Sequence, residues 1–271
     1  MPPLPAFDPH FDVLSVAFLF AFVYEYANRR LRPLTAPSEP GPTTAQRWSW
    51  HLGVFSILVA SWWPVHDLAE ESMITFHMLE HLILGYVTPV LLLRGMNRWF
   101  ADWSIGRRAI ARLIRPFANP VTAFFFFNVM IVFVHWPEMV AIQNTNEAAH
   151  LLLHFLLFAS GVALWLPIFS PTPAFHRISE PMQVLYLFLT TIVPIVPASF
   201  LTFSSKPLYP VYLDAYTRWG IDPLVDQTMA GILMKLGAGF YLLGMGARIW
   251  FAWSNREQSW DEIERELVET K

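Results

Sequence analysis

Long apolar stretches separated by short polar segments dominate this chain. A bilayer core about 30 Å thick needs roughly 20 mostly apolar residues per helix, with a lower limit near 17. Seven stretches meet this requirement, at residues 11–27, 48–64, 73–93, 120–136, 147–169, 183–203 and 228–252. The pattern predicts an all-α integral membrane bundle of about seven transmembrane helices.

Charged residues alternate in sign from loop to loop. Arginines follow the first, third and fifth spans and gather at the end of the seventh, whereas the loops 65–72, 137–146 and 204–227 carry mainly Asp and Glu. Because Lys and Arg resist translocation across the membrane, we expect the N-terminus outside and the C-terminus in the cytoplasm. We interpret residues 1–271 as a single polytopic membrane domain that ends in a short cytoplasmic tail, 254–271.

The composition argues against several kinds of partner and functional site. Only 14% of the 271 residues are charged, against about 25% in soluble domains. The net charge of -3 leaves no basic excess to neutralise phosphates, which argues against a nucleic-acid partner. The chain has no cysteine, so thiolate nucleophiles, disulfides and CxxC metal-transfer motifs are excluded. Any metal ion must therefore be held by His, Met or carboxylate side chains.

Histidines gather at one depth, near the expected outer ends of three spans. The third span opens with His77 and His81 and the fifth with His150 and His154, and each i, i+4 pair lies on one helix face. His135 ends the fourth span, although a lone histidine there is equally well explained as a hydrogen-bond partner between helices. Ionisable groups inside the hydrocarbon are costly and mark functional sites. We interpret the two pairs as a metal site.

The ligand types favour copper. Imidazole suits zinc, copper, iron or nickel, and a nearby thioether favours Cu(I). The predicted ligands are His77, His81, His150 and His154, with His135 and Met78 as additional ligands. Asp67, Glu147 and Asp226 would fix the imidazole tautomers or line the entry. Asp67 and Asp226 would equally serve as helix caps.

Two charged residues lie deep within the spans. Glu80 in the third span and Lys235 in the seventh are at comparable depths, since each residue rises about 1.5 Å along a helix. Pairing them would remove two otherwise costly buried charges. We therefore predict an intramembrane ion pair between Glu80 and Lys235.

Two other interpretations stay open. The segment HMLEH at 77–81 fits the H-x-x-E-H pattern, in which two histidines bind zinc and Glu80 would activate water. That pattern would make the chain a zinc-dependent membrane hydrolase. One histidine from each of two helices would instead suit the axial ligation of haem in a membrane electron-transfer protein.

Several further motifs follow one another in a characteristic order. They are HMLEHLILGYVTPVLLLRG at 77–95, the histidine-pair helix ending in Trp-Leu-Pro-Ile at 165–168, PLYPVY at 207–212 and WGIDPLVDQTMAGILM at 219–234. With these motifs the chain resembles, from about Trp62 to Gly246, the multi-spanning CtaG family of cytochrome c oxidase assembly factors. The positions that match the family are Asp67, His77, Met78, His81, His150, His154, Asp226, Gln227 and Met234. The chain departs from the family at Glu80, where Gln is usual, and at Lys235, where an aromatic residue is usual.

The resemblance implies a multi-pass protein of the bacterial plasma (inner) membrane that is needed for a functional haem–copper oxidase. It implies a role in bringing copper to that enzyme, without an established catalytic activity. We therefore predict a non-enzymatic assembly factor that binds copper, as Cu(I), near the periplasmic face and hands it to an oxidase subunit. A homo-oligomer is compatible with the sequence.

Overall fold

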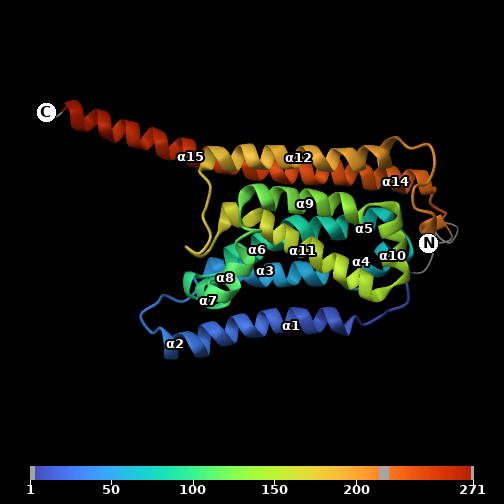
Figure 1. The fold of residues 1–271 in the computed structure, drawn as a ribbon, viewed down its shortest axis with the longest axis horizontal. Helices are drawn as coiled ribbons and strands as arrows, with labels where there is room; N and C mark the ends of the chain where they lie inside the picture. Colours follow the sequence, from blue (N-terminus) through green and yellow to red (C-terminus); the bar gives the residue numbers. More distant parts are fainter. Residues whose placement is uncertain (1–3, 214–219, 270–271) are drawn as a thin grey trace.

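The computed structural model describes residues 4–213 and 220–269, and it folds them into a bundle of helices (Figure 1). The helices are α1 (Phe11–Tyr26), α2 (Arg32–Thr35), α3 (Thr44–Ala60), α4 (Val65–Glu71), α5 (Ile74–Leu82), α6 (Thr88–Gly95), α7 (Arg98–Ser104), α8 (Arg108–Ile114), α9 (Pro120–Val134), α10 (Pro137–Thr145), α11 (Glu147–Phe169), α12 (Glu180–Phe203), α14 (Pro223–Ile232) and α15 (Ala238–Glu269). This arrangement confirms the all-α prediction.

The number of spans also agrees with the sequence. Within the described residues, six helical segments are long and apolar enough to cross a membrane, and α9 with α10 makes a seventh if that pair is one span. The six are Phe11–Thr35, Thr44–Glu71, Ile74–Gly95, Glu147–Phe169, Glu180–Phe203 and Pro223–Trp260. The chain between α9 and α10 bends by 71°, because His135 and Trp136 leave the helix and Pro137 begins the next one.

Short π-helical turns lengthen three of these spans. They join α1 to α2, α5 to α6 and α14 to α15, at Ala27–Leu31, Ile83–Val87 and Leu233–Gly237. The turn before α6 has a direct cause in Pro89, which has no N–H to donate to the carbonyl one turn earlier. Such turns frequently occur near functional sites. Two of these three directly follow α5 and α14 along the chain.

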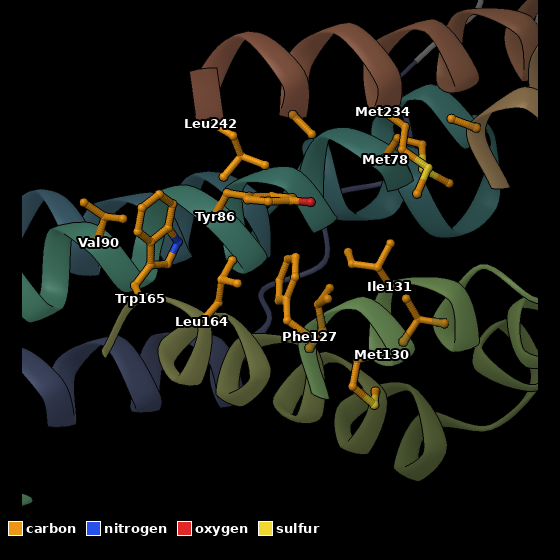
Figure 2. Packing of buried hydrophobic residues seen from close by; sticks show 14 of the residues in the cluster. Met78, Tyr86, Val90, Phe127, Met130, Ile131, Leu164, Trp165, Met234 and Leu242 are labelled. Atoms are coloured by element: carbon orange, nitrogen blue, oxygen red, sulfur yellow. The ribbon is translucent and has the colours of Figure 1, made fainter. Parts of the chain in front are cut away.

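Helix α11 occupies the centre of the bundle. It packs on α9 on one side and on α6 on the other, while α6 packs on α3 and α3 on α1. At the opposite edge, α12 packs against α14 and α15 (Figure 1). The main core lies between α5, α6, α9 and α11, where Tyr86, Phe127, Leu164 and Trp165 interdigitate (Figure 2).

A second, smaller core attaches α1 to the bundle. Tyr24 stacks on Trp50 with ring centroids 4.6 Å apart, and Phe100 packs edge-on against both rings. The Tyr24 hydroxyl donates a hydrogen bond of 2.9 Å to the Gly95 carbonyl at the end of α6. Further polar contacts link α1 to α3, from Trp50 to the Phe20 carbonyl and from His51 to Glu25. Together they fix a helix whose exposed residues are mostly apolar.

The last span is longer than expected. Helix α15 runs without a break through residues 254–269, so the predicted cytoplasmic tail continues the helix of the final span. The reason is local, because no Gly or Pro lies between residues 247 and 269 to end the helix. The N-terminal part of the chain and the C-terminal end of α15 lie at opposite ends of the bundle (Figure 1).

Helix α11 approaches the third span most closely at Gly161. A Cβ added there would lie 2.3 Å from the Gly85 carbonyl oxygen and 3.0 Å from Cγ of Pro89. Gly161 therefore acts as a small residue that lets two backbones meet, as is common between membrane helices.

We predict that Gly161→Ala destabilises the protein by about 1–3 kcal/mol, the usual cost of overpacking a core. Gly244→Ala is the matched control, because a Cβ at Gly244 meets nothing within 4 Å. The control should gain roughly 0.5–1 kcal/mol from the better helix propensity of Ala. Unfolding in mixed micelles with rising dodecyl sulfate measures both, and equal stabilities for the two variants would contradict the close approach.

Candidate metal centre

The histidines meet at the end of the bundle where α4, α5, α10 and the start of α11 lie together (Figure 1). Helix α4 contributes His66, α5 contributes His77 and His81, the corner after α9 contributes His135, and α11 contributes His150 and His154. All six side chains are buried. Because they come from four segments, the cluster exists only when the bundle is assembled.

Three of these rings converge on His81. Its Nδ1 lies 3.2 Å from Nε2 of His135, and its Nε2 lies 3.2 Å from Nε2 of His154. The ring of His77, one turn earlier on α5, lies 4.1 Å from the His81 ring between centroids. We call His77, His81, His135 and His154 the inner cluster.

The tautomer of His135 is fixed by the backbone. Its Nδ1 lies 2.5 Å from the Ile131 carbonyl oxygen, which only accepts, so Nδ1 carries the proton and Nε2 keeps its lone pair toward His81. Metal-binding histidines are usually held in this way. Both 3.2 Å contacts are within hydrogen-bonding distance for neutral imidazoles, and they involve the two different nitrogens of His81. A bound ion would take the place of one of these contacts.

Thioethers border the inner cluster. Met78 of α5 and Met234, in the π turn after α14, line a void of about 10 Å³ together with His81 and His135. Figure 2 shows the two methionines beside each other at this end of the core. The void is at the lower limit for one water molecule, and its lining supplies both imidazole and soft sulfur donors.

A second group of ligands lies toward the end of the bundle. Nδ1 of His150 is 2.7 Å from Oε1 of Glu70, and Nε2 of His66 is 3.6 Å from the same oxygen. One ligand atom from each of these residues lies within 4.8 Å of the others. We call His66, Glu70 and His150 the outer cluster. It is the more accessible group, since the Glu70 side chain is 35% exposed.

The two clusters are contiguous. The ring of His150 lies 4.2 Å from that of His154, between centroids. A row of imidazoles therefore runs from the accessible Glu70 to the fully enclosed His81.

Glu80 connects the clusters electrostatically. This carboxylate has no exposed surface, and its Oε1 accepts a hydrogen bond from Ser61 at 3.1 Å and lies 3.0 Å from Nδ1 of His66. Nδ1 of His154 is 3.5 Å from the same oxygen. One carboxyl oxygen thus contacts a histidine of the outer cluster, His66, and lies near a histidine of the inner cluster, His154.

The structure does not bring Glu80 and Lys235 together. Among the described residues, the ion pairs of Glu80 go to His66 and His154, and the Lys235 ammonium lies 4.9 Å from the centroid of the Phe203 ring. The reason is rotation about the helix axis, because Lys235 faces α12 whereas Glu80 faces α4. Similar depths of Glu80 and Lys235 in their spans were therefore not enough to predict an ion pair between them.

Several buried polar atoms in the cluster have no hydrogen-bond partner within the described chain. They are Nε2 of His77, Oε2 of Glu80 and both ring nitrogens of His150, whose short contact to Glu70 lacks hydrogen-bond geometry. Unpaired buried polar atoms are costly. The donor set of imidazole, thioether and carboxylate fits a transition-metal ion, which would take up these free positions.

The remaining predicted site residues have other surroundings. Asp67 lies 3.2 Å from Nε2 of His10, beside the outer cluster. Asp226 accepts hydrogen bonds from the backbone of Ile74 and Thr75 and so caps α5 from a neighbouring helix. Gln227 bonds the backbone of Leu208, Leu201 and Lys206. Glu147 is exposed in the first turn of α11.

Three contributors escaped the sequence reasoning. Glu70 carried a usable signal, because it follows His66 by four residues and shares its helix face. His10 precedes the first span, and its ring reaches within 4.8 Å of the His66 ring. Ser61 ends α3 and gives no signal, since a single serine at a helix end is common.

Comparison with known proteins agrees with the resemblance noted in the motifs. The family model described as cytochrome c oxidase caa3 assembly factor (Caa3_CtaG) matches residues 22–256. Neither a curated protein nor a solved structure matches the chain. The family match covers every helix that contributes to the two histidine clusters. The chain is a multi-pass membrane protein that belongs to the cytochrome c oxidase caa3 assembly factor family.

Proposed function

We propose that this family member binds copper, as Cu(I), at the inner cluster and helps deliver it to a subunit of a haem–copper oxidase in the bacterial plasma membrane. The observation that carries the proposal is the convergence of His135 and His154 on His81 at 3.2 Å, from three different segments. The backbone contact of His135 leaves its Nε2 lone pair directed into the cluster.

The choice of Cu(I) rests on the neighbouring sulfur atoms. Met78 and Met234 border the same void as His81 and His135, and thioether ligands favour Cu(I) over harder ions. The chain has no cysteine that could hold copper instead.

Copper would enter from the end of the bundle that carries the outer cluster. Glu70 is the most accessible of the grouped ligands, and because the arginine-rich loops lie at the other end of the bundle, we expect this end to face the periplasm. An incoming ion would meet His66, Glu70 and His150 first and then pass along the adjacent imidazoles to the inner cluster. In this model His150 is an entry ligand, and the inner ligands are His77, His81, His135 and His154.

The geometry gives less support to a haem-binding electron-transfer protein or a zinc-dependent membrane hydrolase. Ring nitrogens 3.2 Å apart leave no space for a porphyrin between His81 and either of its neighbours. A hydrolase would need Glu80 beside a water in an open cleft, but this carboxylate has no exposed surface and contacts Ser61 and His66. A non-catalytic assembly role agrees with the family.

The metal content of the purified protein tests the site. His81→Ala/His154→Ala should lower bound copper at least tenfold, because it removes two converging imidazoles. The control is His51→Ala/His176→Ala, which removes two histidines outside the clusters. Mass spectrometry of protein from copper-supplemented cells gives the copper-to-protein ratio, and loss of copper in both variants, or in neither, would sink the assignment.

The rate of copper uptake tests the role of the outer cluster separately from that of the inner cluster. Glu70→Gln should slow copper uptake from a Cu(I) chelator several-fold and leave the final stoichiometry unchanged, because Glu70 contacts only outer ligands. Glu147→Gln provides a matched carboxylate change on the exposed start of α11. Absorbance of the chelator follows the transfer, and uptake at the wild-type rate would remove the entry role.

The assembly role is tested in cells of the source bacterium. An oxidase purified from cells carrying only His81→Ala/His154→Ala should contain haem but less than stoichiometric copper, with reduced oxygen consumption. Immunoblotting of membranes establishes that the variant is present at the wild-type level. A normal copper-to-haem ratio in that oxidase would separate copper binding from assembly.

A further inference from the structure

A basic cavity lies at the opposite end of the bundle from the histidines. Its volume is about 480 Å³, and it opens between the end of α6, the start of α7, the end of α11 with the loop that follows, and α15. Four arginines line it, and each comes from a different one of these segments: Arg94, Arg98, Arg177 and Arg248. Nothing in the copper proposal uses this cavity.

The charge of these arginines is mostly unbalanced. Arg98 lies 3.7 Å from Asp102, and Arg177 donates two hydrogen bonds to the Ser170 carbonyl, which holds its guanidinium in place. Within the part of the chain that the structure describes, neither Arg94 nor Arg248 makes an ion pair. Four guanidinium groups and one carboxylate leave a strong local excess of positive charge, which favours an anionic ligand.

Apart from Gln46, the remaining residues that line the cavity are apolar. Leu93, Phe169, Met245, Ile249 and Ala252 line the cavity between the arginines. The Arg94 guanidinium lies 5.7 Å from the centroid of the Phe169 ring, which helps to hold it at the rim. A small inorganic anion would use the arginines and leave this apolar surface uncovered. A ligand with an anionic head and apolar chains would use both.

We propose that this cavity binds the phosphodiester headgroup of an anionic phospholipid from the leaflet at this end of the bundle. Arginine forms bidentate hydrogen bonds with phosphate, and basic pockets between membrane helices at the cytoplasmic side are suited to anionic headgroups. The acyl chains would lie along the apolar residues of α15 and α11. The positive-inside rule assigns the arginine-rich end to the cytoplasm, where the leaflet is anionic.

Native mass spectrometry of the full-length protein in detergent tests the proposal, with phosphatidylglycerol as the probe. The wild type should retain one phosphatidylglycerol in preference to phosphatidylcholine. Arg94→Gln/Arg248→Gln should weaken this binding roughly 25-fold, because each arginine near an anionic lipid contributes about fivefold. Arg94→Lys/Arg248→Lys keeps the charge and should bind within a few-fold of the wild type.

The control variant is Arg112→Gln/Arg115→Gln, which removes two exposed positive charges of α8 and the residue after it, outside the cavity. Its affinity should stay at the wild-type value. An equal loss of phosphatidylglycerol binding in this control would mean that binding depends only on the net charge of the protein, and it would overturn the site. Equal retention of phosphatidylcholine, or displacement of the lipid by millimolar inorganic phosphate, would overturn the assignment to an anionic phospholipid. Melting temperatures in detergent exclude unfolding of the Gln variant, and unchanged copper content would keep this site separate from the metal site.

Discussion

The buried carboxylate of Glu80 is the constraint on which the outer end of this bundle depends. A carboxyl group without exposed surface is costly unless other polar groups surround it, and here Ser61 and His66 approach the same oxygen while His154 lies nearby. These partners come from the end of α3, from α4 and from α11. The contacts of one carboxyl oxygen, Oε1 of Glu80, therefore join four segments at the place where the histidines gather.

The packing of the neighbouring helices also helps to hold the histidines together. Gly161 lets α11 lie against the backbone of Gly85. The π-helical turn before Pro89 directly follows α5, the helix that carries His81. Asp226 caps α5 from α14, which holds α14, and Met234 after it, close to the histidine-bearing helix. The histidines of the proposed metal site are thus held in place by groups that lie outside it.

The bundle is chemically polarised. One end collects histidines and carboxylates, and the other collects arginines around an apolar cavity. A protein that handles a cation benefits from an acidic entrance and a basic opposite end, because the field draws the ion to one face and repels it from the other. The arginines at the far end are also the residues from which the positive-inside rule predicts the orientation of the chain in the membrane.

The sequence by itself determined the helices and the ligand types. Apolar length predicted the spans, and the i, i+4 spacing placed His77 beside His81 and His150 beside His154, because both patterns depend only on local helix geometry. Tertiary structure alone decided which groups face one another. It turned His150 toward Glu70 and Glu80 toward His66, and it brought Met234 beside His81. Depth along a helix is encoded locally, whereas its rotation and neighbours follow from packing of the whole bundle.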